Sequence, residues 1–192
     1  MGIEYELKFR AARDVQAAIL ATVPGEDRHF SMQTTYYDTP TGQLSQRHYT
    51  LRRRMENGIS VCTLKAPAPV GRGEWETACD RIEDSIGMLC KLGGPPELPQ
   101  LVSEGLVAVC GARFHRIART VLLDDCTVEL AVDSGVLTGG DRELPLYEIE
   151  VELKEGSMDA CNRFAQALAA RFGLENEPKS KFRRALALYK GE

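Results

Sequence analysis

The sequence has few of the residues that build soft-metal sites. It contains three histidines, and its six cysteines include no C-x-x-C pair. Structural zinc sites need cysteine and histidine at characteristic spacings. We therefore expect no soft-metal site and no disulfide framework, and we expect the cysteines to be reduced residues of the core or of strands.

Basic charge is not in excess, and no long apolar run is present. The 192 residues carry a formal net charge of -4 and are 43% hydrophobic. Bulk electrostatics thus give no reason to expect a nucleic-acid or membrane partner. Glu4, Glu6 and Lys8 interrupt the first residues, so no secretory leader is expected. We expect one cytoplasmic globular domain over residues 1–192, as a monomer or homodimer.

No glycine-rich phosphate loop is present, because no segment matches G-x-x-x-x-G-K-[ST] or G-x-G-x-x-G. A phosphate group would therefore have to be held by side chains.

Residue patterning predicts about eight strands, which favours an α+β fold built on an antiparallel sheet. Closure into a barrel would remove the edges of the sheet. The expected strands are 3–10, 28–38, 48–55, 59–66, 73–79, 112–124, 126–138 and 145–154. Helices are expected at 14–23, within 80–110 and at 158–172, followed by a basic segment at 178–189.

Charged residues recur at every second position in several of these strands, so each set projects from one face. The sets are Glu4, Glu6 and Lys8; Arg52 and Arg54; Glu74 and Glu76; and Glu148, Glu150 and Glu152, with Lys65 and Arg116 on further strands. For any single strand, the simpler interpretation is a solvated face. Successive carboxylates on one face repel each other, however, and a cation would relieve that repulsion.

Ligands that are all oxygen indicate a hard ion, Mg²⁺ or Mn²⁺. A glycosidase would also use paired carboxylates, but it would not explain the matching lysines and arginines. Guanidinium and ammonium groups suit the oxygens of a phosphate chain.

The ordered motifs of the chain resemble the CYTH (triphosphate tunnel) family, and most of all the CYTH domain of bacterial inorganic triphosphatases. Glu4-Tyr5-Glu6-Leu7-Lys8 matches the E-x-E-x-K signature. Further matches are Tyr36-Tyr37-Asp38-Thr39, Leu51-Arg52-Arg53-Arg54, Thr63-Leu64-Lys65, Glu74-Trp75-Glu76, Arg113-Phe114-His115-Arg116, Glu129-Leu130-Ala131-Val132-Asp133, Glu148-Ile149-Glu150-Val151-Glu152 and Ser180-Lys181-Phe182-Arg183-Arg184. The matches span nearly the whole chain.

This resemblance implies a closed eight-stranded antiparallel barrel with flanking helices, whose charged faces line a tunnel. It implies metal-dependent hydrolysis of inorganic triphosphate or a related linear triphosphate, with two Mg²⁺ or Mn²⁺ ions. The implied metal ligands are Glu4, Glu6, Glu150 and Glu152, and the implied catalytic set adds Lys8 and Glu148. The implied substrate-binding residues are Lys8, Arg52, Arg54, Lys65, Glu74, Glu76, Arg113, Arg116, Asp133 and Lys181.

One position departs from the family pattern. Ala118 stands two residues after Arg116, where many relatives have a second basic residue, and Arg113 or Arg119 could compensate. The alternatives are an adenylate cyclase or a thiamine triphosphatase on the same scaffold, and a polyphosphate-binding module without catalysis. The module is disfavoured because carboxylates oppose anion binding unless a metal is present.

Overall fold

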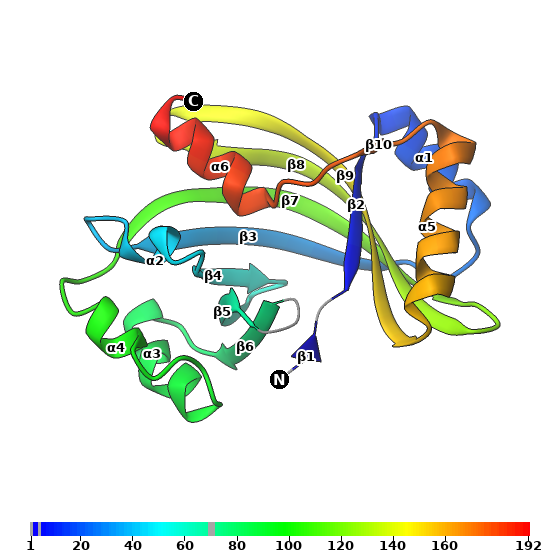
Figure 1. Cartoon of the computed structure of the whole chain (residues 1–192). Helices are drawn as coiled ribbons and strands as arrows, with labels where there is room; N and C mark the ends of the chain where they lie inside the picture. Colours follow the sequence, from blue (N-terminus) through cyan, green and yellow to red (C-terminus); the bar gives the residue numbers. More distant parts are fainter. Residues whose placement is uncertain (1, 4, 69–71) are drawn as a thin grey trace.

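The computed structural model describes residues 2–3, 5–68 and 72–192. Within this part, ten strands form one antiparallel sheet in the order β1-β6-β5-β4-β3-β7-β8-β9-β2-β10 (Figure 1). The strands are β1 Gly2–Ile3, β2 Glu6–Arg10, β3 Arg28–Asp38, β4 Thr50–Glu56, β5 Ile59–Pro67, β6 Arg72–Ala78, β7 Val107–Leu122, β8 Cys126–Gly139, β9 Arg142–Gly156 and β10 Glu175–Asn176. The helices are α1 Arg13–Thr22, α2 Gln43–Gln46, α3 Ile82–Lys91, α4 Leu98–Leu101, α5 Met158–Phe172 and α6 Lys181–Lys190.

The predicted α+β class is confirmed, but the predicted closed barrel is not what the strand pairing gives. The strand order of the described residues is linear, with β1 and β10 at its two ends. The segment predicted as one strand, 3–10, is divided: β1 pairs with β6, whereas β2 pairs with β9. The N-terminal segment therefore connects the two sides of a curved, open sheet.

Two predicted segments differ from the structure. The stretch 80–110 holds α3 and α4 but ends as strand, because Ala108 and Cys110 pair with Tyr37 and Tyr36 of β3. The basic segment 178–189 is largely the helix α6. Ser180 caps this helix by accepting a hydrogen bond from the Arg183 backbone N–H at 3.2 Å.

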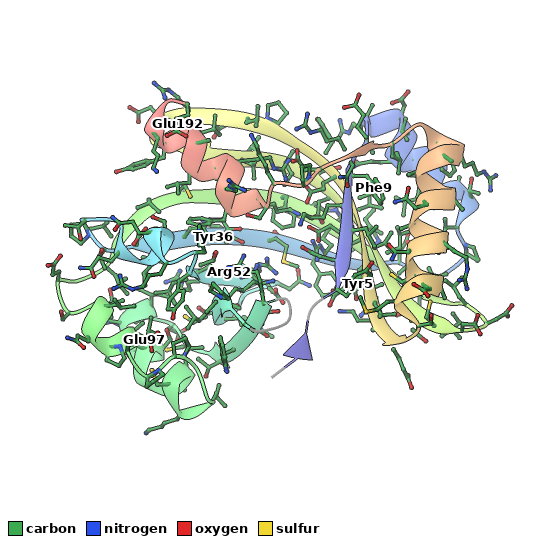
Figure 2. The ribbon with its side chains drawn as sticks, in the orientation of Figure 1. Tyr5, Phe9, Tyr36, Arg52, Glu97 and Glu192 are labelled. Carbon is green, nitrogen blue, oxygen red and sulfur yellow. The ribbon has the colours of Figure 1, made fainter. Side chains whose placement is uncertain are left out.

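The apolar residues of the strands face helices on the outside of the sheet. Phe9 of β2 and Ile149 and Val151 of β9 pack with α1 and α5 in one core (Figures 1 and 2). Leu51, Leu64 and Trp75 of β4, β5 and β6 pack with α2, α3 and α4 in a second core. No helix in the described residues is long and apolar enough to cross a bilayer. The side chains at the alternate positions of these strands therefore face the concave side of the sheet.

Helix α6 lies against β7, β8 and β9 (Figure 1) and packs in a third core with Tyr36, Phe114 and Leu146. The rings of Tyr36 and Phe182 are 5.0 Å apart. Gly139 permits this close approach, because a Cβ there would lie 2.4 Å from the backbone nitrogen of Tyr189. The packing brings the N-terminal end of α6 to the charged residues of β8 and β9.

Candidate active site

A charged cavity of ≈ 770 Å³ lies on the concave side of the sheet. Eleven residues predicted from the sequence line it: Glu6, Lys8, Arg52, Arg54, Lys65, Glu74, Glu76, Arg116, Glu150, Glu152 and Lys181. They come from strands β2, β4, β5, β6, β7 and β9 and from α6. Curvature of the sheet thus brings together motifs that are far apart in the sequence.

One wall of the cavity, formed by β4 and β5, carries closely spaced cations. Figure 2 shows Arg52 below α6, and Arg52 pairs in register with Tyr36 of β3. Arg52 Nη2 and Lys65 Nζ lie 3.7 and 3.5 Å from the same oxygen of Glu74. Arg52 Nε is buried and has no hydrogen-bond partner among the described residues. Burial lowers the pKa of the Arg54 guanidinium, and the charge of Arg52 lowers it further. An anion at this wall would relieve the repulsion.

The opposite wall carries a row of carboxylates across three adjacent strands. Glu6 of β2 pairs in register with Glu152 of β9, which pairs in turn with Glu129 of β8. Residues directly opposite in antiparallel strands share a face, with Cβ atoms about 5 Å apart. Their ion pairs are with long side chains: Lys8 to Glu6 at 3.0 Å, Lys154 to Glu152 at 2.7 Å and Arg28 to Glu129 at 2.6 Å.

These row carboxylates suit a hard divalent cation. Arg28 and Lys154 are 47% and 42% exposed, so they can leave the row at small cost. The ligands on this wall are all oxygens, which Mg²⁺ and Mn²⁺ prefer. Glu4, the other predicted ligand from the N-terminal motif, lies outside the described residues.

A second group of carboxylates, Asp133, Glu148 and Glu150, is satisfied by the protein's own cations. Their oxygens lie within 4.8 Å of one another, which is close enough to hold a metal ion. Lys181 Nζ instead occupies the group, 2.8 Å from Asp133 and 2.6 Å from Glu150, and it also contacts Glu148. Arg116 makes two 2.7 Å hydrogen bonds to Asp133 and a third bond to Glu150.

Burial and pairing set the protonation of this group. Burial raises the pKa of Glu148 to about 7 despite the attraction of Lys181. Burial would also raise the pKa of Glu150, but Lys181 and Arg116 hold it well below its ordinary value. Burial alone would lower the pKa of Lys181, and the three carboxylates raise it instead. Lys181 is therefore a permanently charged, fixed cation at the cavity wall.

Two of the predicted residues stand behind the cavity and one faces away from it. Asp133 and Glu148 are fully buried and hold Lys181 and Arg116 from behind. Arg113 is exposed on the outside of the sheet and bonds Glu143 at 2.5 Å. The position of Arg113 argues against contact with a molecule in the cavity.

Neither Arg113 nor Arg119 compensates for Ala118. Arg119 faces the helices, where it donates to Asp27 and to the carbonyls of Leu20 and Val23. Ala118 pairs in register with Arg28 of β3, whose guanidinium lies beside Glu129. A basic group thus reaches this region from the neighbouring strand.

Several residues at the site were missed from the sequence. Glu56, Arg72, Glu129 and Lys154 also line the cavity. Glu129 begins the Glu129–Asp133 motif. Its two-residue alternation with Ala131 and Asp133 could have placed it on the inner face. The other three carried the same signal, because Lys154 follows Glu148, Glu150 and Glu152 at two-residue intervals, and Glu56 and Arg72 extend the alternations of Arg52 and Arg54 and of Glu74 and Glu76.

Comparisons with known proteins agree with this geometry. A sequence profile of the CYTH domain matches residues 2–186. An inorganic triphosphatase of Haemophilus influenzae is 29% identical over 166 residues, which are 85% of this chain and 47% of that protein. A Bacillus subtilis protein named as a triphosphatase is 34% identical over 86 residues, 44% of this chain and 45% of that protein. The chain spans about half the length of the curated relatives it matches.

Solved structures share the fold. A Hippeastrum protein, described as an adenylyl cyclase candidate with a dominant triphosphatase activity, aligns with a TM-score of 0.69 and 20% identity over 98% of this chain and 96% of its own. The PH1819 protein of Pyrococcus horikoshii aligns with a TM-score of 0.63 and 19% identity, over 98% of this chain and 99% of its own. With the profile covering almost the entire sequence, the chain belongs to the CYTH domain family.

Proposed function

We propose that this protein is a metal-dependent hydrolase that cleaves a phosphoanhydride bond of inorganic triphosphate or a related linear triphosphate. The observation that carries the proposal is the cavity with two opposed walls, a cationic wall on β4 and β5 and a carboxylate row on β2, β8 and β9. The triphosphatase names of the two curated relatives support it.

The cationic wall would bind the phosphate chain. Arg52, Arg54 and Lys65 of this wall, together with Lys8 of β2 on the carboxylate side, face the cavity and offer donors to non-bridging phosphate oxygens. Arg116 and Lys181 would bound the site from the other side, as cations fixed by Asp133, Glu148 and Glu150. Cations placed before the reaction stabilise the charge that develops on the transferred phosphoryl group. Glu74 and Glu76 would orient the neighbouring cations and substrate-bound water.

The carboxylate side would hold the metal through Glu4, Glu6 and Glu152, with Glu129 beside them in the row. Glu150, the fourth ligand that the family resemblance implies, is paired with Lys181 and Arg116 and would instead hold these cations in place. We propose Mg²⁺ or Mn²⁺, with two ions, because the donors are all oxygen. Bound there, the metal would neutralise phosphate charge and lower the pKa of a water molecule. Glu6 and Glu152 would then accept hydrogen bonds from the attacking water. Hydrolysis by direct attack of water needs no covalent intermediate.

The whole chain would act as one CYTH domain, residues 1–192, on a small-molecule triphosphate. We propose a cytoplasmic setting, without a nucleic-acid or membrane partner, because the net charge of the chain is -4. Either a monomer or a homodimer is compatible with the site, since all of its residues come from one chain.

The test is phosphate release from inorganic triphosphate, ATP and thiamine triphosphate, each with Mg²⁺, Mn²⁺ or EDTA. Wild type should hydrolyse inorganic triphosphate fastest and stop in EDTA. Glu6→Gln and Arg52→Ala should each lose about 100-fold or more in kcat/KM. Arg113→Ala, which removes an exposed cation from the outside of the sheet, is the matched control and should retain activity.

The rival functions give different results in the same assay. Faster turnover of thiamine triphosphate, or cyclic AMP formed from ATP, would replace the proposal with the corresponding activity on this scaffold. Polyphosphate binding without turnover of any substrate, and without a metal requirement, would make the protein a binding module.

A further inference from the structure

Two buried charged residues beside the cavity have no part in the proposed chemistry. Glu177 lies between β10 and α6 with its side chain 0% exposed, and Arg184 lies one turn into α6 with its side chain 12% exposed. A buried carboxylate is costly unless it is paired and hydrogen-bonded. Glu177 meets this condition, because it accepts from Arg10 Nε at 2.6 Å and from the Lys179 backbone N–H at 2.9 Å.

These residues form a continuous chain of contacts that ends at the cavity. Arg184 Nη1 lies 3.6 Å from Glu177 Oε2, and Arg184 Nη2 donates to one oxygen of Glu148. The other oxygen of Glu148 accepts from Lys181 Nζ. Lys181 lines the cavity. Arg184 and Glu177, at the other end of this series of contacts, line a separate hollow.

Lys181 is held in position by three carboxylates, of which Glu148 is the one that these contacts support. The Lys181 side chain is 8% exposed, and its ammonium nitrogen lies 5.4 Å from the ring centre of Phe114. A lysine side chain is flexible and holds one geometry only when its donors are fixed. Glu148 can fix one of these donors only while its own carboxylate is held by a second cation, which Arg184 supplies.

We propose that Arg184 and Glu177 are positioning residues for Lys181, acting through Glu148 to hold the ammonium group at the phosphate site. This inference rests on the proposed function in one respect, namely that Lys181 contacts the substrate. Arg184 itself makes no contact with substrate. Its contribution to phosphate binding therefore exists only when Lys181 is present.

The test is a double-mutant cycle on Lys181 and Arg184, with equilibrium binding of inorganic triphosphate in EDTA measured by titration calorimetry. We expect Lys181→Met and Arg184→Met each to weaken binding about tenfold, and the double variant to bind no more weakly than Lys181→Met alone. Arg184→Lys should bind within about twofold of wild type, because it keeps the cation beside Glu148. In steady state with Mg²⁺, the loss in Arg184→Met should appear mainly in KM.

The matched control is Arg142→Met. Arg142 also tethers α6 to the sheet, by donating to the Leu188 carbonyl at 3.1 Å, but it lies at the other end of the helix. Its loss should leave triphosphate binding unchanged. Equal losses in Arg142→Met and Arg184→Met would overturn the inference, because Arg184 would then act only by docking the helix.

Other outcomes also decide the question. Losses that multiply in the double variant would overturn the inference, and so would failure of Arg184→Lys to restore binding. If Arg184→Met does not fold, Glu177→Gln replaces it, and unchanged binding in that variant overturns the inference. Wild type that binds triphosphate with the expected coupling but does not hydrolyse it would refute only the proposed function. Wild type that binds no triphosphate in EDTA, yet hydrolyses it with Mg²⁺, would overturn this inference alone.

Discussion

Replacing Lys181 with methionine tests whether the buried carboxylates depend on this single cation. The substitution keeps an unbranched apolar side chain that is one heavy atom shorter, and it removes the charge. Lys181 Nζ contacts three carboxylates, of which Asp133 and Glu148 have side chains that are 0% exposed. After the change, the three acids share Arg116 and Arg184, so the buried group has one cation fewer than it has carboxyl groups.

Breaking a buried ion pair by removing one partner costs about 3–5 kcal/mol. For a domain of 150–250 residues, each kcal/mol lowers the Tm by about 2–4 °C. The expected fall in Tm is therefore about 6–20 °C in EDTA. Because the oxygens of the three acids lie within 4.8 Å of one another, Mn²⁺ should raise the Tm of the variant more than that of wild type.

Thermal unfolding followed by circular dichroism measures this effect. Lys190→Met is the matched control, because it makes the same chemical change at the exposed end of the same helix. Its effect should stay within about 0.5 kcal/mol. A Tm for Lys181→Met within about 2 °C of wild type, which is less than 1 kcal/mol, would refute the reasoning.

Three further predictions concern residues in different surroundings. Glu129→Gln should raise the Mn²⁺ concentration needed for half-maximal hydrolysis by about tenfold, since it removes one carboxylate of the row that would hold the metal. An unchanged metal requirement would contradict this. Arg119→Met should lower the free energy of unfolding in urea by about 3 kcal/mol, because the carbonyls of α1 lose their donor; a loss below about 1 kcal/mol would exclude that role. Burial raises the pKa of Cys110 to about 12, so iodoacetamide at pH 8 should modify half-buried Cys79 well before Cys110, as peptide mass spectrometry will show.

Alternation of charged and apolar residues predicted most strands and the face that each side chain takes. Glu6 and Lys8 line the cavity while Phe9 packs with the helices, as the period of two requires. The class of fold and the cationic and acidic sets followed from this local pattern. They could be predicted because a strand fixes the direction of each side chain from its position alone.

The partners of those side chains could not be predicted in the same way. Arg113 and Arg116 stand in one motif, yet Arg116 bonds Asp133 and Glu150 inside while Arg113 bonds Glu143 outside. Strand alternation alone could have excluded Arg113, because a three-residue interval places it on the face opposite to Arg116, but it could not identify Asp133 and Glu150 as the partners of Arg116. Glu177 carried no local signal, since it lies between elements and is buried only when α6 docks.

The sequence by itself determined most of the strands, their polar and apolar faces, and the kinds of charge that the polar faces carry. The tertiary structure decided which charges meet: it left the β1–β10 ends of the sheet open, and it filled the Asp133–Glu148–Glu150 group with Lys181. The reason is physical. Side-chain direction is a local property of the backbone, whereas an ion pair depends on sheet curvature and helix docking, which bring together residues distant in the chain.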